Sequence, residues 1–417
     1  MMSRLVYTLL LWLAVPLVVS KLWLRGLREP GYARNRWERF GRYDCAVSGP
    51  VIWVHAVSVG EVRASVPLIG ALRLAYPKHT FLVTCMTAAG REAIDQVFGA
   101  SVLAAYLPYD YPFAVRRFLR HFRPQLGILM ETEVWINLLA ACRRERFPVM
   151  LANGRMSSRS VRGYRRLASL TRPAFESLAV VCAQSEPEAT RFAALGAHHV
   201  QVTGNLKFDV DPDPMLVEAG VALKSALQGR KVLVLASTRE GEERLLLRAF
   251  ERRLPEGLLL VVIPRHPQRF DEVAGVIAEM GWRFARRSRN EPLAGVRVLL
   301  GDTMGEMALY YAAADVAVIG GSFLPLGGQN LIEASAIGTP VVIGPHAHNF
   351  SEIVRLATEA GAAIQVADIT AAVNTALELL ENPERRVAMG RAGKLLCAGH
   401  RGATARHIAA AKALLQP

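Results

Sequence analysis

Residues 51–61 read VIWVHAVSVGE, an apolar run followed by a small, turn-forming segment and a glutamate. Val51–Val54 shows none of the polar alternation of a half-exposed strand, so it predicts a strand that is buried on both faces of a sheet. Ser58 and Gly60 suit a tight turn, and the helical pattern over Glu61–Tyr76 predicts that a helix follows directly. A buried strand that leads into a helix is typical of parallel α/β sheets.

The same strand–helix alternation continues along the chain in two series of short runs rich in Val, Ile and Leu. In the first half, further strands are predicted at Thr80–Thr84, Val102–Leu107, Leu126–Met130, Val149–Ala152, Ala179–Ala183 and Val200–Thr203. In the second half, they are predicted at Lys231–Ala236, Leu258–Ile263, Val296–Leu300, Val316–Ile319 and Pro340–Ile343. This pattern predicts two sheets of parallel strands.

An acidic, proline-spaced linker at 209–214 separates the two series. We therefore expect two Rossmann-like, doubly wound α/β domains, at 30–208 and 215–395, that face each other across a central cleft. Ligands of such sheets bind beyond the carboxyl ends of the strands, so the residues that follow the strands are the first candidates for chemistry. A C-terminal helix at 396–417 is expected to pack back on the N-terminal domain.

The N-terminus holds an uncharged stretch, LVYTLLLWLAVPLVVS, at residues 5–20. It is shorter than the ~20 apolar residues that cross a bilayer core, although Leu22–Leu24 extends it beyond Lys21. A signal peptide cleaved near Ser20 is the alternative, but the positive charges that follow disfavour export. We expect residues 1–29 to form an uncleaved membrane-anchoring helix with a basic flank, which holds the remaining chain at the cytoplasmic face.

The chain of 417 residues carries 50 basic against 36 acidic side chains, a formal net charge of +14. The excess is concentrated between Arg143 and Arg172, where Glu145 stands against nine arginines. A solvated surface is the ordinary explanation of a charge run, but this one-sidedness favours an anionic partner such as lipid headgroups or a phosphorylated substrate. Nucleic acid is not expected, because no RNA- or DNA-binding motif is present.

Several protein classes are disfavoured by composition and spacing. The five cysteines form no CxxC or CxxH pair, so neither a zinc site nor a disulfide framework is supported, and scattered thiols fit a reducing compartment. No GxGxxG follows the first strand of either half, so a dinucleotide oxidoreductase is not expected. A hydrophobic content of 52% with 21% charge excludes a disordered chain.

Four side chains in the first half stand where polar groups would face a cleft. Glu61 is either a helix cap, which its spacing alone favours, or a base whose ionised form the helix dipole maintains at low basicity. Glu131 and Glu133 follow the fourth strand and point the same way in extended chain, so one of them is suited to orient a cation or a sugar hydroxyl. Lys207, beside the linker, is either a solvated hinge residue or a partner for phosphate.

In the second half, polar residues follow most strands, and the segment from Gly327 to Glu333 is the most informative of them. Gly327 and Gly328 run into a predicted helix and are expected to expose free backbone N–H groups, a phosphate site, with a plain tight turn as the alternative. Glu333, one turn further, is suited to accept two hydrogen bonds from a ribose diol.

Six segments together, in chain order, resemble the bacterial 3-deoxy-D-manno-octulosonic acid (Kdo) transferases that are specific for lipid A. They are HAVSVGE at 55–61, LPYD at 107–110, METE at 130–133, GNLKFD at 204–209, PRHP at 264–267 and GGQN at 327–330. The similarity extends over nearly the whole chain. Ile136, Gly154 and Gln329 depart from the proline, alanine and histidine that are usual in the family, which puts a donor role of residue 329 in doubt.

The resemblance implies a two-domain GT-B fold and the transfer of Kdo from CMP-Kdo to a bisphosphorylated lipid A precursor at the inner membrane, with inversion of the anomeric centre. It makes Glu61 the general base and assigns transition-state stabilisation to Glu131 and Lys207. Its CMP-binding segments correspond to Pro264, Arg265, Met304, Gly305, Glu306, Asn330, Leu331, Ile332 and Glu333, with Gly327 and Gly328 as candidate phosphate contacts. No Asp-x-Asp signature lies in the cleft segments, so we expect neither a metal nor another cofactor.

Two alternatives remain open at this point. Another GT-B enzyme, a UDP-sugar transferase or a nucleotide-sugar 2-epimerase, would share the fold and the ribose-binding glutamate. A basic peripheral protein without enzymatic activity would explain the charge and the anchor, but not Glu61, Glu131 and the glycine-rich helix starts.

Overall fold

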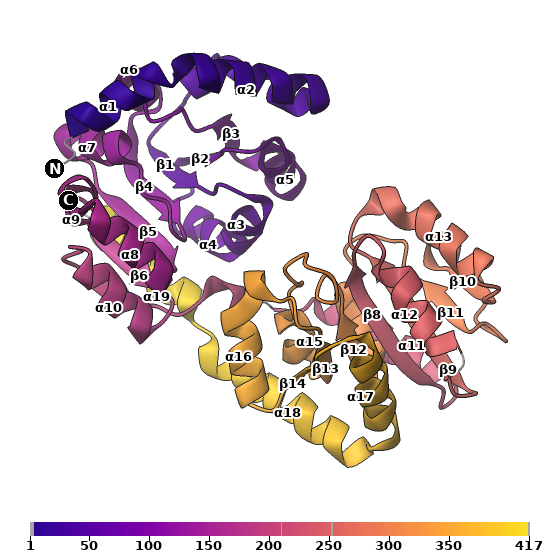
Figure 1. Cartoon of the computed structure of the whole chain (residues 1–417). Coiled ribbons are helices and arrows are strands. Elements are labelled where there is room, and N and C mark those ends of the chain that lie inside the picture. The colour runs from indigo at the N-terminus through magenta and orange to yellow at the C-terminus, as the bar shows by residue number, and fades with distance from the viewer. Residues whose placement is uncertain (1–3, 210, 252, 416–417) are drawn as a thin grey trace. The chain divides into compact units, whose positions relative to one another are not determined.

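The computed structural model describes residues 4–209, 211–251 and 253–415. The chain divides into two compact units, an N-terminal unit of Met1–Asp209 with Arg401–Pro417 and a C-terminal unit of Val210–His400 (Figure 1). Each unit holds one seven-stranded sheet in which all strand pairs are parallel. The predicted α/β class with two Rossmann-like domains is therefore confirmed.

The sheet of the N-terminal unit has the strand order β3-β2-β1-β4-β5-β6-β7. Its strands are β1 (Val51–His55), β2 (Thr80–Cys85), β3 (Leu103–Tyr106), β4 (Pro124–Met130), β5 (Val149–Gly154), β6 (Val180–Ala183) and β7 (Val200–Val202). Its α-helices are α1 (Arg4–Leu13), α2 (Val15–Arg28), α3 (Val59–Ala64), α4 (Val66–Ala75), α5 (Ala88–Phe98), α6 (Pro112–Phe122), α7 (Ile136–Glu145), α8 (Ser158–Arg166), α9 (Ala168–Glu176), α10 (Glu186–Ala194) and α19 (Ala403–Leu415).

Helices cover both faces of this sheet, which explains the apolar run that defines β1. Side chains alternate along a strand, so Ile52 and Val54 pack in a core with α3, α4, α5 and α19. Val51 and Trp53 pack in a second core on the other face, with α6, α7, α9 and α10. All four side chains are buried, as a strand between two helical layers requires.

The sheet of the C-terminal unit has the order β10-β11-β9-β8-β12-β13-β14. Its strands are β8 (Lys231–Thr238), β9 (Leu258–Pro264), β10 (Phe284–Arg286), β11 (Val298–Leu300), β12 (Val316–Ile319), β13 (Val341–Ile343) and β14 (Ala363–Gln365). Its α-helices are α11 (Pro214–Ala226), α12 (Glu242–Glu251), α13 (Phe270–Glu279), α14 (Met307–Ala313), α15 (Ile332–Ile337), α16 (Ser351–Glu359), α17 (Ile369–Glu381) and α18 (Pro383–His400).

Three expectations about element boundaries are wrong. The single helix predicted over Glu61–Tyr76 is two helices, because Pro67 in the first turn of α4 lacks the N–H that an uninterrupted helix needs. The three-residue edge strands β10 and β14 were not predicted, since so short a run carries no periodicity. The expected domain boundary at residue 395 falls inside α18, which continues to His400; the chain turns at Gly402, with φ 88°, before α19 begins.

The helices α1 and α2, indigo in Figure 1, are attached to the N-terminal unit rather than extended away from it. Tyr7 donates its hydroxyl to Asp110 Oδ2 at 3.0 Å, and Tyr111 donates to the carbonyl of Leu11 at 3.0 Å. Within the described residues, no single helix has both the length and the apolarity to cross a membrane. The segments Arg4–Leu13 and Val15–Leu27 meet both criteria only as a pair, which bends by 51° at the break.

Candidate active site

The strand order of each sheet shows where a ligand would bind. In the N-terminal unit, the chain leaves β1 towards β2 on one side and later returns to β4 on the other, so the loops after β1 and β4 diverge. The carboxyl ends at such a switch point form the usual binding crevice of doubly wound sheets. Glu61 follows β1 and Glu131 follows β4, so the topology brings these two predicted residues to one edge.

Glu61 lies in the first turn of α3, where the turn after β1 holds its carboxylate. Ser58 caps the helix and donates its hydroxyl to Glu61 Oε1 at 3.1 Å, while the backbone N–H of Val57 donates to Oε2 at 2.8 Å. Burial nevertheless raises the pKa of Glu61 to about 7. The nearby carboxylates of Glu131 and Glu133 also raise this pKa.

The expectation that the helix dipole keeps Glu61 ionised and weakly basic is therefore wrong. Removal of the carboxylate from water outweighs both hydrogen bonds, because desolvation disfavours the charged form of an acid. A carboxyl group with a pKa near 7 is matched to proton abstraction at neutral pH. Glu61 thus has both the position of a helix cap and the proton affinity of a base.

Glu131 directly follows β4 in a left-handed backbone conformation, with φ 57°. Its N–H donates to the Ala152 carbonyl at 2.9 Å, and its own carbonyl accepts from the N–H of Arg155 at 3.2 Å. Non-glycine residues adopt this conformation at an energetic cost of about 1–3 kcal/mol, and they concentrate at functional sites. The turn aims the side chain at Lys207, whose Nζ lies 3.4 Å from Glu131 Oε1.

Lys207 lies in the short 3₁₀ helix η4 (Leu206–Phe208), which Asn205 caps by accepting the N–H of Lys207 at 3.0 Å. Both partners of the Lys207–Glu131 ion pair are mostly buried, with exposed side-chain fractions of 21% and 16%. Burial also raises the pKa of Glu133, the second carboxyl group after β4. The structure thus collects a carboxyl group of raised pKa, an ion pair and a further acid at one edge of the N-terminal sheet.

A glutamate at the switch point of the C-terminal sheet, between β8 and β12, has a different role that sequence reasoning did not identify. Glu242 is fully buried and accepts backbone N–H groups from Arg239, Gly321 and Phe323 at 2.9, 2.6 and 2.9 Å. It therefore fixes the loop after β12. Glu242 could have been found from the sequence by its position, because it lies in the first turn of the helix that follows a central strand, as Glu61 does.

The predicted nucleotide-binding residues lie on several loops of the C-terminal unit. Pro264 ends β9, and Arg265 after it donates from Nε to Gln329 Oε1 at 3.2 Å. Asn330 accepts the N–H of Ile332, the first residue of α15, at 3.1 Å, while Leu331 and Ile332 are buried. These contacts hold the loop from Gln329 to Ile332 in place.

Glu333 is the most informative residue of this set. Its carboxyl group is largely buried, burial raises its pKa, and within the described part of the chain it has no hydrogen-bond partner. No donor of the described chain occupies its oxygens, so a ligand that binds here must supply hydrogen-bond donors. The adjacent hydroxyl groups of a ribose fit this requirement.

Glu306 is held by another side chain that the sequence did not reveal, Arg287. Arg287 donates from Nη2 and Nε to the two carboxylate oxygens at 2.8 and 3.2 Å, and Thr303 donates its hydroxyl to the same group. These partners lower the pKa of Glu306. Met304 and Gly305 are exposed beside this pair, with Gly305 at φ 85°. The segment is a structured loop whose tip is open to solvent.

The expectation for the glycine pair is wrong in part. Gly328 does not offer a free N–H, because it donates to the carbonyl of Gly321 at 2.6 Å. Both glycines have positive φ, 92° and 79°, and a Cβ on Gly327 would meet Asn349 at 2.0 Å. They form a tight turn in a crowded place, three residues before α15. This corresponds to the alternative explanation of the pair, and the close approach of backbone segments is its physical reason.

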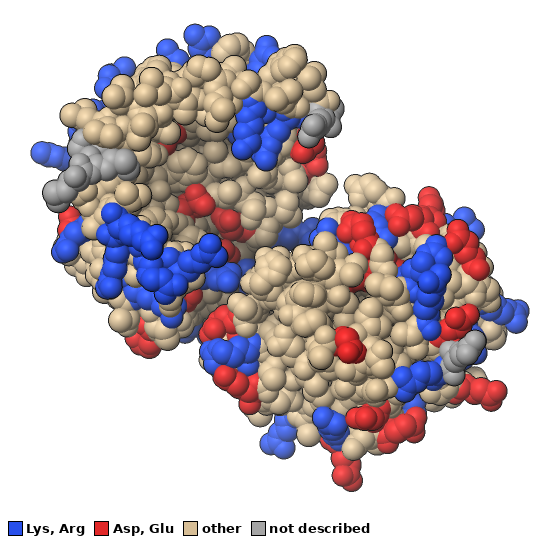
Figure 2. All heavy atoms as spheres, in the orientation of Figure 1, with Lys and Arg blue, Asp and Glu red and all other residues tan. Residues whose placement is uncertain are grey.

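Figure 2 shows acidic side chains in a hollow of the N-terminal unit and a dense group of basic side chains on its flank, over α8. Arg159, Arg162, Arg165 and Arg166 of α8 are all exposed, and no ion pair is recorded for them in the described structure. An exposed cluster of uncompensated arginines is suited to phosphate groups.

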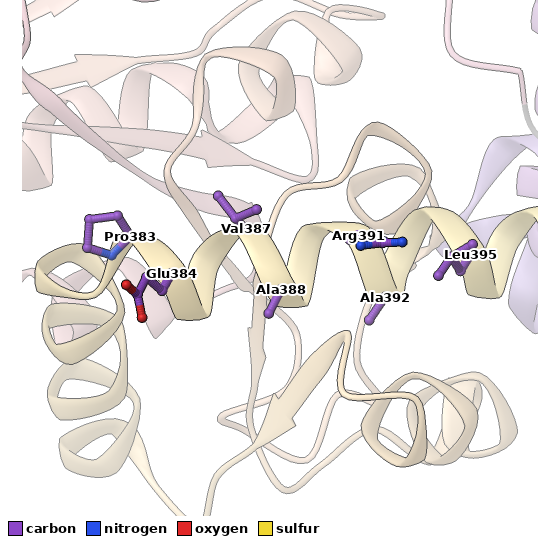
Figure 3. A pocket seen from close by; sticks show the side chains of 7 residues that line it. All are labelled: Pro383, Glu384, Val387, Ala388, Arg391, Ala392 and Leu395. Carbon is purple, nitrogen blue, oxygen red and sulfur yellow. The ribbon is translucent and has the colours of Figure 1, made fainter.

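Among the described residues, no group of three or more His, Cys, Asp or Glu side chains could hold a metal ion. A groove of about 650 Å³ follows one face of α18 and is lined mainly by apolar side chains, including Val387, Ala388 and Leu395 (Figure 3). It holds none of the predicted site residues.

Comparison with known proteins agrees with this arrangement. Residues 34–210 match the family described as 3-deoxy-D-manno-octulosonic-acid transferase, and residues 260–396 match glycosyl transferases group 1. The 3-deoxy-D-manno-octulosonic acid transferase of Bordetella pertussis is 45% identical, with 98% of each chain covered. The enzyme of the same name from Haemophilus influenzae is 36% identical, with 100% of this chain and 99% of the relative covered.

A solved structure supports the fold. HepE from Anabaena, crystallised in complex with UDP, is similar over 88% of this chain and 99% of its own, with a TM-score of 0.56 and 14% identity. At this identity the likeness extends to the two-sheet architecture alone.

Proposed function

The chain belongs to the 3-deoxy-D-manno-octulosonic acid (Kdo) transferase family of glycosyltransferases, and from this premise we propose that it moves Kdo from CMP-Kdo to a bisphosphorylated lipid A precursor in lipopolysaccharide synthesis. Family membership rejects the alternative of a basic peripheral protein without enzymatic activity. The observation that carries the mechanistic proposal is the Glu61 carboxyl group, held by two hydrogen bonds, with a pKa of about 7 beside the Lys207–Glu131 ion pair.

In the proposed reaction, Glu61 accepts the proton of the acceptor hydroxyl as its oxygen attacks the anomeric carbon of Kdo. The bond from that carbon to the CMP phosphate breaks, and CMP leaves with the electron pair. Attack opposite to the leaving group inverts the anomeric centre. A base with a pKa near the working pH is sufficiently available and sufficiently strong to assist this attack.

Lys207 is proposed to offset negative charge on the leaving phosphate or on the Kdo carboxylate as the transition state forms. Glu131 keeps the ammonium group in place through their ion pair, so little reorganisation is required during the reaction. In other transferases a divalent ion offsets the charge of the leaving phosphate. Because Lys207 is proposed to offset this charge here, we propose a reaction that requires neither a metal nor another cofactor.

CMP is proposed to bind in the C-terminal unit. The unpartnered Glu333 would accept the ribose hydroxyl groups, and the loops that contain Arg265 and Glu306 would contact the remaining nucleotide. The arginines of α8 are proposed to bind phosphate groups of the acceptor lipid.

The N-terminal helices are proposed to keep the protein at the cytoplasmic face of the bacterial inner membrane. Their apolar side chains are unusually exposed, with 80% for Leu5, 70% for Leu13 and 71% for Leu17. Such a surface is favourable in a membrane interface and unfavourable in water. The attachment of α1 through Tyr7 and Asp110 favours helices that lie along the interface.

Incubation of a lipid A precursor with the protein and freshly generated CMP-Kdo tests the proposal. Mass spectrometry is expected to detect the addition of Kdo. UDP-sugars, offered in parallel, are expected to give no product. Product from a UDP-sugar alone would establish the alternative GT-B activity instead.

A further inference from the structure

The C-terminal helix α19 is joined to the segment that contains Lys207. Asp209 lies two residues after Lys207 and accepts the backbone N–H of Gly402 at 2.7 Å with one carboxylate oxygen. Its other oxygen accepts the N–H of Thr404. These two N–H groups lie at the start of α19, where the helix itself supplies no acceptor, so Asp209 caps that helix. Residues separated by almost the whole C-terminal unit therefore meet beside the proposed catalytic lysine.

His407 of α19 continues this connection into the sheet. Its side chain is fully buried, with Nδ1 2.7 Å from the Ala403 carbonyl and Nε2 2.9 Å from the backbone nitrogen of Asn153. The carbonyl is an acceptor, so Nδ1 must carry the proton; the N–H of Asn153 is a donor, so Nε2 must be bare. Only the neutral imidazole satisfies both partners. Burial lowers the pKa of His407 to about 4, which maintains that form.

Asn153 in turn holds the residues that precede Lys207. It lies near the end of β5 with φ 54°, a conformation that asparagine tolerates better than most residues. Its side-chain Oδ1 accepts the N–H of Leu206 at 3.0 Å. Its carbonyl accepts from Gln184, whose own Oε1 accepts from the Asn205 amide at 3.0 Å. Two separate paths thus lead from Asn153 to the start of η4.

The same end of β5 also supports Glu131. The carbonyl of Ala152, just before Asn153, accepts the N–H of Glu131, and the N–H of Arg155, two residues later, donates to the Glu131 carbonyl. Asn153 therefore lies in the irregular end of β5 that holds the backbones of both members of the Lys207–Glu131 pair. A change at this end of β5 would displace the two side chains relative to each other.

We propose that His407 is a positioning residue of the transferase reaction: through the N–H of Asn153, it fixes the end of β5 that sets the geometry of Lys207 and Glu131. This inference rests on the role of Lys207 in the proposed function. It makes the C-terminal helix part of the catalytic apparatus, although α19 supplies no group that touches the substrate.

The variant His407→Phe keeps a ring in place but removes the acceptor for Asn153. We expect kcat to fall roughly 10- to 100-fold, the range of a small misplacement at a reacting centre. The KM for CMP-Kdo is expected to stay unchanged, because the nucleotide residues lie in the other unit. His407→Gln, whose amide oxygen can accept a hydrogen bond, is expected to recover part of kcat. The matched control is Ile408→Ala, which removes packing from the same helix and is expected to lower Tm without this loss of kcat.

A double-mutant cycle with Lys207→Ala separates positioning from general destabilisation. If His407 acts through Lys207, His407→Phe changes the residual rate of the Lys207→Ala variant little. The same fold-loss in both backgrounds, or a normal kcat in His407→Phe, would overturn the inference. If His407→Phe does not fold, Asn153→Gly tests the next link in the same cycle, since glycine accepts φ 54° and the substitution removes the side chain that accepts the N–H of Leu206.

The Lys207→Ala variant on its own distinguishes failure of the proposed function, in which Lys207 stabilises the transition state, from failure of the inference about His407. Normal turnover of that variant would refute the role of Lys207 and the inference together. A strong loss there, combined with a normal His407→Phe variant, would refute the inference alone.

Discussion

Lys207 Nζ lies 3.4 Å from Glu131 Oε1, although 76 residues separate them in the chain. The pair forms because β4 and the segment after β7 both end at the same edge of the N-terminal sheet. Glu61 joins this edge from β1, and its pKa is raised by burial and, to a smaller extent, by the neighbouring carboxylate of Glu131. The sheet therefore brings together a cation, an anion and a carboxyl group that titrates near neutrality.

Replacement of the proposed base tests this organisation most directly. Glu61→Gln is expected to reduce turnover by about 10²- to 10⁴-fold, the usual effect of removing a general base. CMP binding, measured by the rise in Tm that CMP produces, is expected to persist. Glu186→Gln is the matched control, because Glu186 is an exposed acid in the first turn of α10. Near-normal turnover of Glu61→Gln would reduce Glu61 to a helix cap.

The pH dependence of the reaction follows from the same group. A base must be deprotonated to act, so kcat/KM is expected to rise with pH and to level off above about pH 7, the pKa of Glu61. The Ser58 hydroxyl lowers this pKa, and Ser58→Ala is therefore expected to move the rising limb to higher pH. A profile that is flat from pH 5 to 8, or a shift to lower pH in Ser58→Ala, would contradict the assignment.

Glu333 offers a test in which stability and function move in opposite directions. Glu333→Gln removes a partly buried carboxylate that has no hydrogen-bond partner in the described part of the chain, and burial disfavours its charged form, so the protein without CMP is expected to gain in Tm. Hydrogen bonds to a charged group contribute about 1.5–3 kcal/mol, so CMP affinity is expected to fall roughly 10- to 100-fold. Thermal unfolding with and without CMP measures both. Loss of stability together with unchanged CMP binding would indicate a structural role.

The apolar surface of the N-terminal helices predicts membrane binding that can be weakened at chosen positions. The double variant Leu13→Glu and Leu17→Glu is expected to lower partitioning onto anionic vesicles by at least about 100-fold, since each buried leucine contributes roughly 1.5–3 kcal/mol. Leu74→Glu is the control, because Leu74 of α4 is 86% exposed and lies outside these helices. Equal loss in the control and the double variant would refute a specific membrane surface.

The proposed metal independence is tested by chelation. Turnover in excess EDTA is expected to equal turnover in its absence, because cationic side chains are proposed to offset the charge of the leaving phosphate. Collapse of activity in EDTA, with recovery upon addition of Mg²⁺, would show that this part of the mechanism is wrong.

Most of the sheet could be predicted from local pattern. Each of the twelve predicted runs lies on an observed strand, since uninterrupted apolar segments are stable only between two helical layers. The short strands β10 and β14 and the break at Pro67 were missed or misplaced, because they depend on neighbours rather than on periodicity. The predicted free amide of Gly328 failed for the same reason, as its acceptor, Gly321, belongs to a different turn.

The order of apolar runs and turns by itself determined the two parallel sheets and the residues that follow each strand, because burial on both faces leaves such runs no other stable arrangement. Tertiary structure alone decided the properties of those residues. The proton affinity of Glu61 depends on its removal from water and on carboxylates after β4, and the setting of Lys207 depends on His407 and Asn153. Desolvation and hydrogen bonding act through space, so no stretch of sequence contains them.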